Sequence, residues 1–130
     1  MIYRVIAAVF LFLNVNYAPV YGQQADSESG FIAYFDDVPL MKGLTELDDE
    51  RVIFDTEAGT IAETVLVGKL TSVDILAFYT QSLNQLGWRE IEAGHSPSRL
   101  TFTRDKQVLS LRLFDAGETK NLLVHLEPRN

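Results

Sequence analysis

The chain contains two histidines, the residue type that most often acts in catalysis and metal binding near neutral pH. His95 lies in the turn-like stretch GHSPS, and His125 lies in the alternating stretch LLVHLE. A metal site needs several converging ligands, and a hydrolase needs a histidine that meets an acid and a hydroxyl in one cleft. The sequence places the two histidines on separate elements without such neighbours. We therefore expect structural or solvent-exposed roles for both, and we keep a hydrolase of unrecognised type as a distant alternative.

Acidic residues occur in two runs, Asp36-Asp37 and Asp48-Asp49-Glu50. Two carboxylates can perform acid–base chemistry when burial raises the pKa of one of them. Both runs lie in polar sequence, which favours solvated surface, and the stretch LTELDDE lacks the alternating ligands of a recognised calcium loop. The chain has no cysteine, which excludes thiolate metal ligands and a thiol nucleophile. We expect no catalytic site, no metal and no cofactor.

The apolar segment FIAYFDDVPLM, residues 31–41, lies between a polar leader and a loop broken by Pro39 and Gly43. It has two interpretations. The simpler is an edge strand or a loop that covers the core. The other is a recognition segment that docks on a partner or pairs with it as an extra strand. The candidate partner-binding residues are Phe31, Tyr34, Phe35, Leu40 and Met41.

The N-terminal sequence is typical of a secretory signal peptide. Arg4 is followed by the apolar run 5–13, and small residues precede a cleavage site that we place after Gly22. An uncleaved membrane anchor is the alternative, but Asn14 and Asn16 interrupt the run well before the roughly 20 apolar residues that a spanning helix needs.

We therefore divide the chain into a signal peptide (1–22), a flexible leader (23–34) and a single domain (35–130). The net charge is −7, and cleavage would remove one arginine. Such a surface repels phosphate backbones and anionic headgroups, so we expect no nucleic-acid binding and no stable membrane insertion after cleavage. A chain without cysteine or an Asn-x-Ser/Thr site fits a bacterial periplasm better than a eukaryotic secretory route.

The spacing of large apolar residues predicts an amphipathic helix over residues 72–86, packed on a sheet. The stretch TSVD at 71–74 matches a capping box at its start. Gly87 can end the helix in a left-handed conformation, and in that motif Trp88 packs on Leu83.

The remaining pattern has a period of two and short turns, which predicts antiparallel strands. These strands are 52–54, 60–67, 88–93, 99–104, 107–114 and 122–127. The expected fold class is α+β: a two-layer sandwich in strand–helix–meander order, with the helix packed on an antiparallel sheet of about five to six strands.

Three stretches together, DDVPLMKGLTEL, VIFDTEAGTIAE and FYTQSLNQLGW, resemble small exported single-domain hypothetical proteins of alphaproteobacteria. In that group, a loop of the form Leu/Val-Pro-x-Met-x-Gly-Leu precedes a strand, a helix ending in Leu-Gly-Trp and a meander. The resemblance covers about residues 35–127. It implies the fold and an exported location, and it implies no activity or functional residue.

These features favour a non-enzymatic exported envelope protein, an interaction or accessory module whose partner is another envelope protein. The alternative is a small-molecule or lipid carrier that uses space between helix and sheet. In that case a bulky residue at Ala62 or Ala77 would block the ligand without unfolding the domain.

Overall fold

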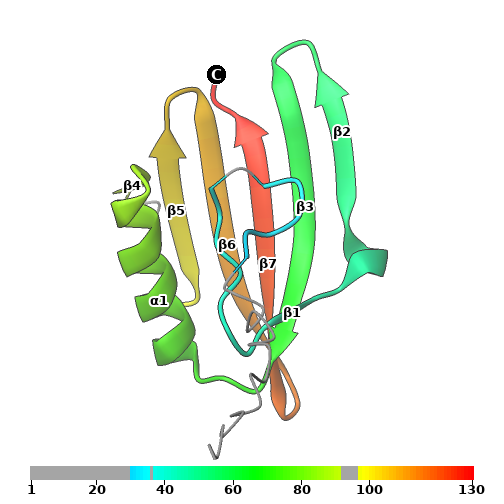
Figure 1. Cartoon of the computed structure of the whole chain (residues 1–130), viewed down its shortest axis with the longest axis vertical. Helices are drawn as coiled ribbons and strands as arrows, with labels where there is room; N and C mark the ends of the chain where they lie inside the picture. The colour runs from blue at the N-terminus through cyan, green and yellow to red at the C-terminus, as the bar shows by residue number, and fades with distance from the viewer. Residues whose placement is uncertain (1–29, 36, 92–96) are drawn as a thin grey trace, which may run out of the picture.

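The structure, a computed structural model, describes residues 30–35, 37–91 and 97–130. Within these ranges one α-helix packs on a seven-stranded antiparallel sheet (Figure 1), which confirms the mixed α+β character of the chain. The predicted signal peptide lies outside the described residues. In the described part of the chain, no helix has the length and apolar character needed to cross a membrane.

The structure contains one strand more than the sequence predicts. The described elements are β1 (Thr45–Glu46), the short 3-10 helix η1 (Asp48–Glu50), β2 (Val52–Thr56), β3 (Gly59–Gly68), α1 (Ser72–Gln85), β4 (Arg89–Ile91), β5 (Arg99–Arg104), β6 (Gln107–Ala116) and β7 (Thr119–Pro128).

The additional strand is β1, in a stretch that we expected to be irregular because of Pro39 and Gly43. Both residues precede the strand, so they do not prevent Thr45 from pairing with Val67 of β3. The order of the sheet is β1-β3-β7-β6-β5-β4, and β2 also pairs with β3. The strands β1 and β2 therefore lie along the same side of β3, joined through η1.

Both ends of α1 form as the sequence predicts. At the start, the Thr71 hydroxyl accepts a hydrogen bond from the Asp74 N–H at 3.1 Å. At the end, Gly87 has a φ of +88°, and the Trp88 N–H donates to the Leu83 carbonyl oxygen at 2.9 Å. This bond satisfies a carbonyl group that the end of a helix would otherwise leave without a partner.

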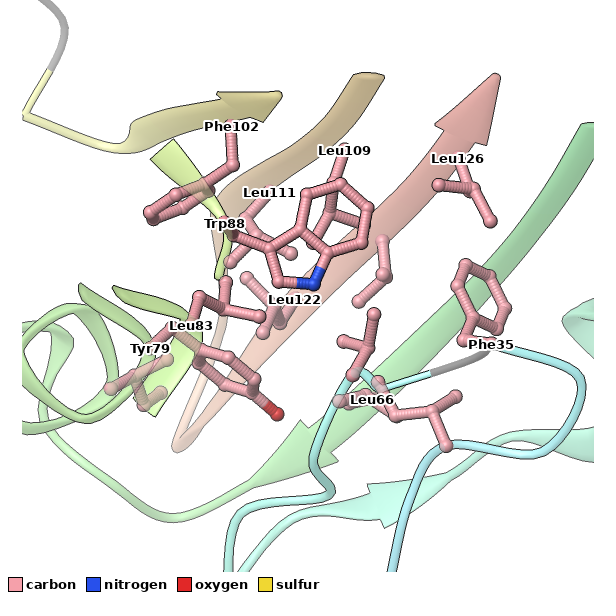
Figure 2. Packing of buried hydrophobic residues seen from close by; sticks show 14 of the residues in the cluster. Phe35, Leu66, Tyr79, Leu83, Trp88, Phe102, Leu109, Leu111, Leu122 and Leu126 are labelled. Carbon is pink, nitrogen blue, oxygen red and sulfur yellow. The ribbon is translucent and has the colours of Figure 1, made fainter. Parts of the chain in front are cut away.

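The core lies on one face of the sheet. Alternate side chains of the long strands point into it, and the helix contributes Ile75, Tyr79 and Leu83. The strand residues are Ala62 and Leu66 of β3, Phe102 of β5, Leu109, Leu111 and Leu113 of β6, and Leu122, Val124 and Leu126 of β7. Figure 2 shows Leu66, Leu109, Leu111, Leu122 and Leu126 around Trp88, with Phe35 at the β3 end of the cluster.

Two segments cover this core. In Figure 1, α1 lies beside β4 and β5, whereas residues 30–44 cross over the part of the sheet formed by β6, β7 and β3. Ile32 and Val38 of the second segment are fully buried. Ile32, which the sequence assigned to the leader, is part of the core, and its N–H donates to the Val38 carbonyl oxygen at 2.8 Å.

Arg104 at the end of β5 connects the two covering segments. Its Nη1 donates to the Leu86 carbonyl oxygen at 3.2 Å and to the Asp37 carboxylate at 2.9 Å. Its guanidinium also lies 4.5 Å from the ring centroid of Trp88, a cation–π geometry. One side chain thus binds the end of α1, the loop near residue 37 and the indole between them.

Residues 30–44 pack very closely on the sheet at Gly68 of β3. A Cβ at this position would collide with the Gly43 carbonyl oxygen and lie 2.9 Å from Leu44 Cδ2. We expect Gly68→Ala to lower the free energy of unfolding by about 1–3 kcal/mol, as overpacking does. Urea denaturation measures this change. Gly117→Ala is the control: its φ is +71° and no heavy atom lies within 4 Å, so only the left-handed strain of about 1 kcal/mol applies. Equal losses in the two variants would contradict the close packing.

Candidate functional site

Residues 30–40 form a closed loop on the core. The Leu40 N–H donates to the Gly30 carbonyl oxygen at 2.7 Å, and Phe31 forms an isolated antiparallel bridge with Pro39. At the tip, Tyr34 has a φ of +66°, and Asp37 has a φ of +57°. Left-handed backbone costs energy in residues other than glycine, and such strain clusters at functional sites. The contacts of this loop must therefore offset the backbone strain at Tyr34 and Asp37.

The predicted partner-binding residues divide into two groups in this loop. Phe35 is only 2% exposed and belongs to the core, and Leu40 and Met41 are half-buried against it. Phe31 and Tyr34 are 56% and 70% exposed. The loop therefore covers the core with some side chains and presents two aromatic rings to solvent with others.

Met41 is also tied to the helix. Its N–H donates to the hydroxyl oxygen of Tyr79 at 3.3 Å. Burial raises the pKa of the Tyr79 hydroxyl well above its ordinary value, and the bond from Met41 opposes this only in part. The Tyr79 hydroxyl therefore stays protonated and serves as a fixed acceptor for the loop.

The exposed ring of Tyr34 lies next to the start of β2. The Arg51 guanidinium is 5.3 Å from the ring centroid, and Arg51 directly precedes the strand. Arg51 also donates to Glu46 and Asp48, each at 3.0 Å. The hydrogen bond to Glu46 raises the pKa of Arg51 above its ordinary value. Glu46 in turn accepts from the Ala33 N–H at 3.4 Å, so this ion-pair network fixes the loop against the edge of the sheet.

The strand β2 has an unusual exposure for its composition. All five of its residues are exposed, including three consecutive large apolar ones: Val52 at 51%, Ile53 at 37% and Phe54 at 50%. In the described chain β2 pairs only with β3, so its other edge carries backbone groups without strand partners. Native proteins usually shorten, charge or cover such an edge, because it can pair with another chain. The sequence predicts this strand, but no pattern in it predicts that the strand lies at the edge of the sheet.

His125 lies on the face of the sheet opposite the helix. Its Nδ1 is 3.0 Å from a Glu63 carboxylate oxygen, and its Nε2 is 3.4 Å from Glu127. The register places Glu63 of β3 and Ser110 of β6 on either side of it. An acid, a histidine and a hydroxyl thus share one row. A catalytic triad needs a ring nitrogen directed at the hydroxyl, whereas both nitrogens of His125 face carboxylates. His95 lies outside the described residues.

The other candidate groups have simple surroundings. Asp37 forms the ion pair with Arg104, and η1 consists of three exposed acids. Among the residues with described positions, no group of three or more potential ligands could hold a metal ion. For the carrier alternative, Ala62 is buried against the helix side of the sheet but Ala77 is exposed, so Ala77 does not face a space between helix and sheet.

We compared the chain with known proteins and found no relative. No protein-family model, no curated protein and no solved structure matches the chain. The functional argument therefore rests on the residues of this chain and on their geometry.

Proposed function

We propose that this chain is a non-enzymatic exported envelope protein that acts as an interaction module, and that it binds an extended segment of another envelope protein along the free edge of β2. The exposure of this strand carries the proposal: three consecutive large apolar residues lie on an edge that pairs with no strand in the described part of the chain. An added strand would bond the free backbone groups and cover these side chains, as in other cases of β-strand addition.

The surroundings of β2 indicate the chemistry of the partner segment. Val52 and Phe54 project from one face of the strand and Ile53 from the other, so alternate apolar side chains of an added strand find contacts on both faces. Acidic residues lie at both ends: the exposed acids of η1 precede the strand, and Asp55 lies near its end. A partner with alternating apolar residues between basic ones complements this edge.

Tyr34 extends the same surface. Its ring centroid lies 5.3 Å from the Arg51 guanidinium, beside the beginning of β2. Exposed aromatic side chains and arginine are enriched where proteins bind each other, because they bury a large area at a small entropic cost. Tyr34 and Arg51 are therefore the anchor residues that we assign to this interface.

The proposal also keeps the two-layer arrangement and the export that the sequence predicts. In this arrangement α1 and residues 30–44 form the layer on one face of the sheet, and the Tyr34 ring of this layer reaches Arg51 at the start of β2. Cleavage after Gly22 would release the domain into a bacterial periplasm, where segments of other envelope proteins are accessible to it.

Crosslinking in cells, read out by mass spectrometry, tests the interface. We expect wild-type protein to capture a discrete partner that Ile53→Lys and Phe54→Lys lose, because a lysine at a strand edge opposes pairing. The double variant Phe31→Ala, Tyr34→Ala should capture less of the same partner. Val73→Lys is the matched control, since Val73 is an apolar residue of α1 that is 76% exposed.

All these positions are exposed, so circular dichroism should show an unchanged fold in each variant. A partner that both β2 variants retain would refute the assignment of the edge. Loss of the partner in Val73→Lys to the same extent would mean that any added surface charge disrupts the complex, and it would equally refute the assignment.

A further inference from the structure

A second site lies on the sheet face opposite the helix. The register of β5, β6 and β7 aligns three residues there: Arg99 lies opposite Arg112, and Arg112 lies opposite Leu123. The adjacent row consists of Ser110, His125 and Glu63. Together these six residues line a shallow hollow of about 200 Å³.

The two arginines are an unusual pair. Side chains directly opposite on one face of antiparallel strands lie close together, and like charges in that position destabilise a sheet. Neither Arg99 nor Arg112 forms an ion pair with any residue that the structure describes. The Arg112 guanidinium makes a cation–π contact instead, 5.7 Å from the ring centroid of Phe114. Their N–H groups are therefore free to bind an anion from solution.

The charge of the hollow is opposite to that of the chain. The whole protein carries a net charge of −7, whereas the hollow combines two arginines with one carboxylate, that of Glu63. Guanidinium groups present paired N–H donors that match the two oxygens of a carboxylate. Glu63 is held in place by the 3.0 Å contact of its carboxylate with His125. Its negative charge repels an anion in the hollow, and it repels a dianion more strongly than a monoanion.

We propose that this hollow binds the carboxylate of a small organic monoanion. The carboxylate lies between Arg99 and Arg112, and the Ser110 hydroxyl donates to it. The apolar part of the ligand lies on Leu123, the one aliphatic side chain that lines the hollow. The size of the hollow suits a compact ligand, since pockets for drug-sized molecules begin at about 300 Å³.

Amide NMR titrations of the purified protein with butyrate, acetate and sulfate, at constant ionic strength, test this site. We expect shifts centred on residues 99, 110–112 and 123. Butyrate should bind more tightly than acetate because of its apolar chain, and the dianion sulfate should bind most weakly because of Glu63. Arg99→Gln and Arg112→Gln should each weaken butyrate binding about tenfold, the size of effect that a charged hydrogen bond produces.

Arg89→Gln is the matched control. Arg89 is exposed on the same face, opposite Thr103 and outside the hollow, and the substitution changes the net charge equally. In addition, Arg99→Gln should leave the melting temperature without ligand unchanged or raised, because it removes repulsion between like charges. That result separates loss of the anion site from loss of the fold.

Three outcomes would overturn the proposal. They are the absence of shifts at the hollow with either carboxylate, an equal loss of binding in Arg89→Gln, and sulfate binding as tight as that of butyrate. The third would show a general attraction for anions, as expected of any exposed arginine pair.

Discussion

Replacing Phe35 with alanine should lower the free energy of unfolding by about 3–5 kcal/mol, the range observed when a buried phenylalanine is truncated. Replacing Tyr34, its neighbour in sequence, should cost less than about 1 kcal/mol, as most exposed substitutions do. Urea denaturation followed by far-ultraviolet circular dichroism measures both values. The slope of each transition shows whether the two variants unfold from the same compact state.

The difference follows from where the two side chains lie. Phe35 is 2% exposed and belongs to the same cluster as Leu66 and Leu126, whereas Tyr34 is 70% exposed. The backbone of the loop is fixed by its own hydrogen bonds, which include Phe35 N–H to the Ile32 carbonyl at 3.0 Å. The loop therefore cannot close over the cavity that Phe35→Ala would leave, and the full cost of the cavity should appear.

This pair of variants also separates the two roles of residues 31–41. If Phe35→Ala is as stable as wild type, the segment is not needed to complete the core and is free to leave the sheet. If Tyr34→Ala is strongly destabilised, the cation–π contact with Arg51 is structural, and Tyr34 is not available as an anchor for a partner. The expected result, a costly Phe35→Ala and a mild Tyr34→Ala, leaves Tyr34 and Phe31 as the residues to test for binding.

The sequence predicts the local elements well because their signals are local. The cap at Thr71, the stop at Gly87 and the strand 99–104 each depend on residues close together in the chain, and the structure contains all three. The alternation in β6 and β7 also identifies the buried leucines, since a strand with one covered face must place its apolar residues there.

The alternation of β3 is less informative. Its sequence places Ile61, Val65 and Val67 on one face, yet the fully buried residues are Ala62, Thr64 and Leu66 of the other. Residues 30–44 pack tightly on that side of the strand, as the close approach of Gly68 to Gly43 illustrates. A contact of this kind joins distant parts of the chain, and no short-range pattern encodes it.

The candidate sites depend on the same long-range information. Five consecutive apolar residues, FIAYF, have no period that separates inward from outward side chains. That separation comes from the turn at Tyr34, whose left-handed backbone is visible only in the structure. The free edge of β2 and the opposition of Arg99 and Arg112 require the order and register of the strands. The sequence contains these residue types, but it does not show which residues become neighbours in the folded chain.

Trp88 should be the other position with a large effect on stability. It is 2% exposed and contacts the core from the segment between α1 and β4, with the Arg104 guanidinium over its ring. We expect Trp88→Ala to lower the free energy of unfolding by about 3–5 kcal/mol. Because Trp88 is the one tryptophan in the sequence, its fluorescence follows unfolding of the wild type, and circular dichroism serves for the variants.

Trp88→Phe is the informative comparison. The buried indole Nε1 finds no hydrogen-bond acceptor among the described residues, and Figure 2 shows this nitrogen directed at other side chains of the cluster. A buried donor without a partner costs about 1–3 kcal/mol, and phenylalanine removes that donor while retaining much of the apolar area. Trp88→Phe should be considerably more stable than Trp88→Ala because it retains most of the buried ring area. If Trp88→Phe is destabilised by more than its lost apolar area accounts for, the indole N–H has a partner, and a buried water molecule with further polar neighbours is the first to seek.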